Sequence, residues 1–157
     1  MGEIVRRWPF ENPPLSLTIR EPSLTGDSLG LKTWGSSYVL AQLLPIFSAG
    51  PLAHLIPDPS SNRSPVDILE LGSGTGLLGL SAACTWGANV VLTDLPEILP
   101  NLAHNTSINI STIQECGGHA EAAALTWGGN EDESDPRFKR GHSYKVSTPD
   151  TMTSPRR

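Results

Sequence analysis

The sequence contains few of the residues that define several large protein classes. Only two of its 157 residues are cysteines, Cys84 and Cys116, and their spacing is not that of a metal site. Such sparse cysteine usage suits a reducing compartment. The histidines share no metal-ligand spacing either, so we expect no metal site (His54, His104, His119 and His142).

An excess of positive charge and a long apolar run are also missing. The chain has 11 lysines and arginines against 16 acidic residues, a net charge of -5 that argues against nucleic acid as a partner. Its longest apolar neighbourhood, Tyr38 to Phe47, contains Gln42 and Pro45 and is shorter than the roughly 20 residues that cross a bilayer. Met1 to Phe10 contain no apolar h-region of a signal peptide. We therefore expect a cytoplasmic or nuclear protein that does not enter the membrane.

The most informative stretch runs from Val66 to Asp94 and predicts one β-α-β unit. Val66 to Leu71 form an apolar run of strand length, and a glycine-dense loop follows. Leu77 to Cys84 are apolar nearly all round, which is typical of a helix packed on a sheet. Gly79 inside this helix costs about 1 kcal/mol relative to alanine, so we expect close packing between helix and strand there. Asn89 to Leu95 then return as the parallel neighbour and carry Asp94 to the end of that strand.

Two cofactors compete for the glycine loop. Gly74 to Gly79 match G-x-G-x-x-G, and Asp94 follows at a distance that suits a ribose-binding acid, so NAD is one candidate. That pattern, however, normally begins at the strand end, which here is Gly72. In addition, the Glu70 carboxylate would repel a bound pyrophosphate but would suit a ligand with an ammonium and a sulfonium group, as in S-adenosylmethionine.

The flanking segments predict further elements of an α/β fold. Trp8 to Pro14 are expected to be irregular, and the alternation at Leu15, Leu17 and Ile19 predicts a strand that returns through Leu29 to Thr33 as a β-arm. Trp34 to Ser37 should open a helix with a serine N-cap and with an apolar stripe that Pro45 kinks or ends (Val39, Leu40, Leu43, Leu44 and Phe47). A helix from Leu95 and a third strand over Ala120 to Trp127 would continue the alternation.

Several motifs together resemble the class I, seven-stranded S-adenosylmethionine-dependent methyltransferases. The motif E-L-G-S-G-T-G-L-L-G is followed by L-T-D-L-P, as in their cofactor motifs. The stretches G-L-K-T-W-G-S-S-Y-V-L-A at Gly30 to Ala41, N-L-A-H-N-T-S-I-N at Asn101 to Asn109 and L-T-W-G at Leu125 to Gly128 are similar to the protein lysine methyltransferase branch, which includes fungal enzymes acting on translation factors.

This resemblance implies a set of cofactor-binding residues. Trp34 would help to close the pocket, Glu70 would orient the amino group, Asp94 would accept hydrogen bonds from the ribose, and Trp127 would lie on the adenine side. The backbone of the glycine loop would line the methionine portion. The full set of candidates is Trp34, Glu70, Gly72, Ser73, Gly74, Gly76, Asp94 and Trp127. The acceptor would be a lysine of a protein, with a translation factor as one candidate, and no catalytic residue is identified.

Four of these residues also have a purely structural interpretation. Trp34 and Trp127 would pack as ordinary aromatics, and Glu70 would pair with an arginine at a strand edge. Asp94 would cap the helix that follows it, a role that is compatible with ligand binding.

We therefore predict an α/β, Rossmann-like three-layer sandwich of the class I methyltransferase type. Its parts would be an N-terminal irregular segment or β-arm (1–28), a partial cofactor-binding domain (29–128) and a largely disordered tail (129–157). Ser143 to Val146 begin what resembles the family's fourth strand, but polar and proline-containing sequence follows. We therefore expect a domain that is incomplete at its carboxyl side and inactive if the acceptor wall is lost. The alternatives are a non-catalytic module that binds the cofactor or a partner, and an NAD-binding oxidoreductase fragment.

Overall fold

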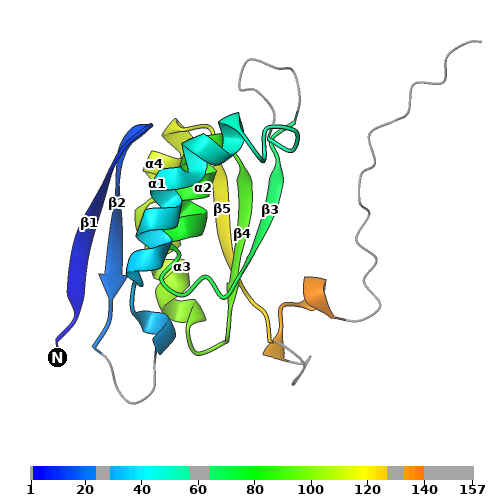
Figure 1. Ribbon diagram of the computed structural model, residues 1–157. Helices are drawn as coiled ribbons and strands as arrows, with labels where there is room; N and C mark the ends of the chain where they lie inside the picture. The colour runs from blue at the N-terminus through cyan, green and yellow to red at the C-terminus, as the bar shows by residue number, and fades with distance from the viewer. Residues whose placement is uncertain (1, 24–28, 57–63, 127–132, 140–157) are drawn as a thin grey trace, which may run out of the picture.

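Two separate β-sheets flank a layer of helices in the computed structural model of the chain (Figure 1). The structure describes residues 2–23, 29–56, 64–126 and 133–139. One sheet is an amino-terminal hairpin and the other has three parallel strands, and the helices lie between them. Within the described ranges, no helix has both the length and the apolar content needed to cross a bilayer.

The three-stranded sheet is built as the central motif predicts. Strands β3 (Asp67–Leu71), β4 (Asn89–Asp94) and β5 (His119–Ala124) are parallel and lie in the order β3-β4-β5. Helix α2 (Leu77–Trp86) connects β3 to β4, while α3 (Leu99–Ile108) and α4 (Ile110–Glu115) connect β4 to β5. Parallel strands joined by helical crossovers make this the predicted Rossmann-like arrangement.

Gly79 shows why a glycine lies inside α2. Its position leaves no room for a Cβ, which would collide with the Glu70 carboxylate of β3 and would lie 2.9 Å from Leu92 Cδ2 of β4. Glu70 and Leu92 are paired in the register of the sheet and face the same helix. The expected close packing of helix on strand is therefore confirmed.

The amino-terminal hairpin differs from the prediction. Ile4–Glu11 form strand β1, which pairs antiparallel with β2 (Pro14–Glu21), so the irregular segment predicted for Trp8 to Pro14 is wrong. Proline is tolerated in β1 because the outer edge of this strand needs no donor. The strand partner of β2 precedes it in the chain, whereas Leu29–Leu31 form a 3₁₀ turn, η1, and not a returning strand.

Helix α1 (Gly35–Ala49) packs on α2 and holds the hairpin through an aromatic cluster. The Tyr38 ring lies 4.8 Å from that of Trp8 and 5.5 Å from that of Phe10, between ring centroids. The predicted serine N-cap is wrong, because Trp34 is the N-cap residue, and its side chain makes no capping hydrogen bond. The helix also continues through Pro45, and of the predicted apolar stripe Leu44 is buried whereas Val39, Leu40 and Leu43 are exposed.

Two element boundaries in the second half of the chain differ from the prediction, the start of α3 and the end of β5. Helix α3 begins at Leu99 and not at Leu95, because Pro100 belongs in the first turn, where its missing N–H is not needed. Strand β5 ends at Ala124, three residues before Trp127, and two of its alanines, Ala120 and Ala123, are buried. These small side chains allow close approach, which explains a strand with poor β-propensity.

Part of the predicted tail is structured. The 3₁₀ turn η3 (Pro136–Phe138) lies beside β5, where Arg137 forms an ion pair with Glu121 and a hydrogen bond with Asp135. The Thr126 N–H donates to the Ser134 hydroxyl at 3.0 Å. Residues 140–157, including the predicted start of a fourth strand, lie outside the described residues.

Candidate cofactor site

The glycine loop between β3 and α2 owes its shape to glycines with positive φ. Gly74 has φ 57° and Gly76 has φ 88°, a region that side-chain-bearing residues rarely adopt. A Cβ on Gly74 would lie 3.1 Å from the Gly30 carbonyl oxygen, and one on Gly76 would lie 2.8 Å from Leu102 Cδ1. The loop is thus pressed against η1 on one side and α3 on the other, so its path is fixed before any ligand binds.

Asp94 ties the end of β4 to this loop. Its Oδ2 accepts a hydrogen bond from the Gly74 N–H at 2.6 Å, and its Oδ1 accepts one from the Leu95 N–H at 2.8 Å. The predicted N-cap role for the following helix is wrong, because α3 begins at Leu99 with Ile98 as its N-cap residue. Asp94 instead holds a partly exposed carboxylate at the carboxyl edge of the sheet, where ligands of open α/β folds bind.

Glu70 is the most perturbed acid of the site. Its Oε2 is buried, with no hydrogen-bond partner of normal geometry among the described residues, although the Gly79 N–H and the Ser73 hydroxyl lie close to the carboxyl group. Loss of solvent is the main cause that raises the pKa of Glu70 to about 7, and the nearby Asp94 raises it further, against the lowering effect of Ser73 and Gly79. Such a carboxylate favours a cationic group beside it.

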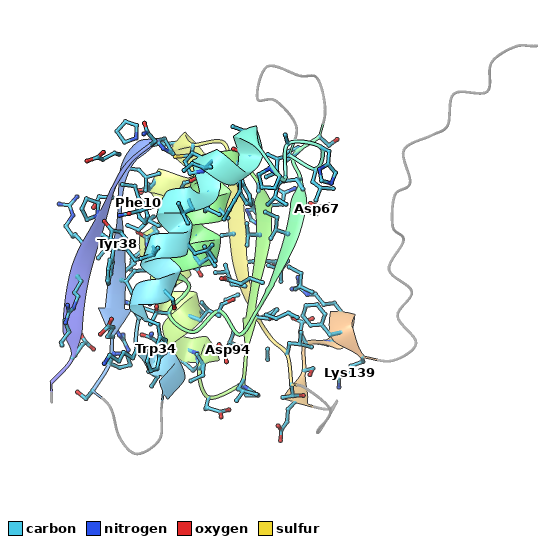
Figure 2. All side chains as sticks on the ribbon, in the orientation of Figure 1. Phe10, Trp34, Tyr38, Asp67, Asp94 and Lys139 are labelled. Atoms are coloured by element: carbon cyan, nitrogen blue, oxygen red, sulfur yellow. The ribbon has the colours of Figure 1, made fainter. Side chains whose placement is uncertain are left out.

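Trp34 contributes the aromatic side of the site. It precedes α1, is 54% exposed, and lies 5.8 Å from Lys32 Nζ, measured to the ring centroid. Figure 2 shows Trp34 and Asp94 at the same end of the molecule, with Asp67 at the opposite end of the sheet. An exposed ring in this position is available for a ligand and is not part of the core.

These groups line one cavity of about 460 Å³. Six of the eight predicted residues contribute to its lining, namely Trp34, Glu70, Gly72, Ser73, Gly74 and Asp94. Gly76 is buried behind the loop, and Trp127 lies outside the described residues. The structure brings the six lining residues together, and their role in cofactor binding stays a prediction.

Sequence reasoning missed other residues that line the cavity. Thr75 of the glycine loop and Lys32 contribute to the lining, while Leu40 of α1 and Leu78 of α2 supply apolar surface. Lys32 and Leu40 fall within the stretch from Gly30 to Ala41 that carries the family resemblance. This resemblance was the sequence signal that could have marked them as residues of the site. No cluster of side chains suited to a metal ion occurs in the part of the chain that the structure describes.

Comparisons with known proteins show which family the chain resembles. The family model described as lysine methyltransferase matches residues 11–140. Protein-lysine N-methyltransferase EFM2 of Saccharomyces cerevisiae is 39% identical over 153 residues, which cover 88% of this chain and 33% of the relative. Protein-lysine N-methyltransferase rrg1 of Schizosaccharomyces pombe is 40% identical over 113 residues, or 72% of this chain and 33% of the relative.

A shorter match involves EEF1A lysine methyltransferase 3 of Mus musculus, which is 41% identical over 61 residues that cover 39% of this chain and 24% of the relative. The chain spans about a third of the length of the two fungal relatives. The family match includes the glycine loop, both acids of the cavity and all three parallel strands. On this evidence, the chain belongs to the lysine methyltransferase family.

Proposed function

We propose that the chain binds S-adenosylmethionine in the cavity between Trp34 and Asp94 and serves methyl transfer to a lysine of a protein. When bound, this cofactor supplies a methyl group on a sulfonium centre. The observation that carries the proposal is the pair of acids on the cavity wall, Glu70 and Asp94.

The residues present suit such a cofactor better than a dinucleotide. Glu70 would accept a hydrogen bond from an ammonium group of the ligand. Asp94 would accept hydrogen bonds from ribose hydroxyls. The loop of Gly72, Ser73 and Gly74 would pass close to the ligand, and Trp34 would cover it. A pyrophosphate in the same place would face two carboxylates, which disfavours an NAD-binding oxidoreductase.

The acceptor is proposed from the relatives. Two of them are named protein-lysine methyltransferases, and a third is named for EEF1A, a translation factor. A lysine amine must lose its proton before it attacks a methyl group, and an apolar surrounding favours this neutral form. Leu40 and Leu78 supply such surface at the cavity. We therefore propose a protein acceptor, with a translation factor of this kind as the first substrate to test.

Calorimetric titration with S-adenosylhomocysteine tests the cofactor proposal. We expect binding by the wild-type chain and at least a tenfold weaker affinity for Asp94→Ala, because this carboxylate would hold two ribose hydroxyls. Asp67→Ala is the matched control, since it removes the same charge from the opposite end of the sheet. Absence of binding by folded protein, or equal affinities of the two variants, would refute the assignment, and NADH binding would favour the oxidoreductase alternative.

Transfer of radiolabelled methyl groups to purified EEF1A tests the reaction. Turnover that is lost in Asp94→Ala and retained in Asp67→Ala supports a methyltransferase. Binding of S-adenosylhomocysteine without turnover on protein acceptors would instead favour the non-catalytic module. Leu69 and Leu71 of β3 are 50% and 48% exposed. Exposed apolar side chains of this kind could contact a partner protein, which favours this second candidate.

A further inference from the structure

Three asparagine side chains bind the hairpin to α3. Two of them belong to the helix, and the third, Asn109, is its C-cap residue. Asn101, Asn105 and Asn109 are spaced by four residues, and all three hydrogen-bond the backbone of β2. A helix rises about 6 Å over four residues, and a strand advances about 6.7 Å over two. Asn105 and Asn109 therefore meet alternate residues of the strand, Arg20 and Thr18, whereas Asn101 also donates to the Arg20 carbonyl.

Asn105 and Asn109 make nearly identical sets of contacts. The Oδ1 of Asn105 accepts from the Arg20 N–H at 2.9 Å, and its Nδ2 donates to the Arg20 carbonyl at 3.1 Å. The Oδ1 of Asn109 accepts from the Thr18 N–H at 2.9 Å, and its Nδ2 donates to the Thr18 carbonyl at 2.7 Å. Both side chains are almost fully buried, at 0% and 2% exposure.

The two asparagines differ in their third hydrogen bond. The Nδ2 of Asn105 also donates to the Thr75 carbonyl at 3.0 Å, whereas the Nδ2 of Asn109 donates to the carbonyl of Asn105 itself at 2.7 Å. Thr75 is buried within the glycine loop, between Gly74 and Gly76. Asn105 is thus the asparagine of the three whose side chain joins the hairpin to the loop of the cofactor site.

A second contact fixes Thr75 from the opposite direction. Its hydroxyl lies 2.9 Å from the hydroxyl of Thr33, a buried pair, and the Thr33 N–H donates to the Glu21 carboxylate at the end of β2 at 3.1 Å. Both supports of Thr75 therefore lead back to the same strand. The shape of the loop depends on the docking of a hairpin that does not itself line the cavity.

We propose that Asn105 is a positioning residue for the cofactor site: it holds the Thr75 segment of the glycine loop in the conformation that binds S-adenosylmethionine. This inference rests on the proposed function for the identity of the ligand. The loop without this hydrogen bond would populate other conformations, and the apparent dissociation constant rises in proportion to the population that is lost.

The experiment compares Asn105→Ala with Asn109→Ala by calorimetric titration of S-adenosylhomocysteine. Each variant loses three hydrogen bonds, two of them to β2, so both should lower the melting temperature. We expect the dissociation constant of Asn105→Ala to rise by about fivefold or more, the effect of one hydrogen bond, and that of Asn109→Ala to change by less than about twofold. Equal effects of the two variants on affinity would overturn the proposal.

Amide hydrogen exchange supplies a readout that does not depend on the ligand. The Gly76 N–H donates to the Ser73 carbonyl at 2.8 Å within the loop. Its protection should fall in Asn105→Ala and persist in Asn109→Ala. If the wild-type chain is folded but does not bind S-adenosylhomocysteine, the proposed function fails, and the exchange of Gly76 still decides whether Asn105 supports the loop.

Aspartate variants serve if Asn105→Ala does not fold. In Asn105→Asp the oxygen that accepts from the Arg20 N–H is kept, but both donated hydrogen bonds are lost and a carboxylate faces the Thr75 carbonyl. Asn109→Asp makes the same change at the matched position. Loss of affinity and of Gly76 protection in the first variant alone supports the proposal, and loss in both or in neither contradicts it.

Discussion

Replacement of Glu70 by glutamine should stabilise the protein at alkaline pH. The pKa of Glu70 is raised from 4.5 to about 7 by burial, so between these values the folded state keeps a proton that the unfolded chain has released. The free energy of unfolding therefore falls as pH rises through this range. Since one pKa unit corresponds to about 1.4 kcal/mol, the burden of the ionised carboxylate reaches about 3 kcal/mol above pH 7.

Glutamine has almost the same shape and does not ionise, so this burden disappears in Glu70→Gln. Urea unfolding at pH 5 and pH 8.5 should show a variant that gains about 3 kcal/mol over wild type at pH 8.5 and about a quarter of this at pH 5. Glu115→Gln, at the exposed end of α4, is the control for a change in net charge. A pH-independent difference between wild type and Glu70→Gln would refute the reasoning.

The affinity of the wild-type chain for S-adenosylhomocysteine, which carries the same ammonium group, should increase from pH 6 to pH 8 as Glu70 ionises. The affinity of Glu70→Gln should be weaker and nearly independent of pH, and calorimetric titration measures both. Gly79→Ala should lower the unfolding free energy despite alanine's helix propensity, because its Cβ would meet the Glu70 carboxylate; urea unfolding measures this. Leu17→Ala in the fully buried part of β2 should cost about 2–5 kcal/mol by the same assay. Arg137→Ala should cost less than about 1 kcal/mol, seen as a small shift in thermal melting, because its ion pair with Glu121 is partly exposed.

The parts of the fold that sequence predicted well are those with local causes. Apolar runs and a glycine-dense loop specify β3, α2 and β4 within a few residues, and most side chains of α2 and several of β4 are buried in the core. Strand β1 was missed because a proline and charged residues weaken its strand pattern, and its stability comes from pairing with β2 and from Tyr38.

The candidate site likewise contains residues that local sequence predicts and residues that depend on long-range contacts. Asp94 and the glycines follow from strand ends and from backbone conformation, which sequence reveals. The roles of Asn105 and Thr33 depend on contacts between segments 85 and 42 residues apart in the chain, so no local pattern could reveal them. The four-residue spacing of the asparagines was visible, but its meaning required the position of β2.

The asparagine contacts have a consequence for how the hairpin meets other chains. An asparagine side chain carries the same donor and acceptor as a peptide group, and in β2 the outward N–H and C=O of Thr18 and Arg20 are already paired with such groups. At Thr18 and Arg20, strand β2 is thus paired on both sides, by β1 and by the side chains of Asn105 and Asn109, which hinders the addition of a further strand there. Addition of a strand to the hairpin has to occur at β1, where proline interrupts the row of donors and guards against uncontrolled pairing.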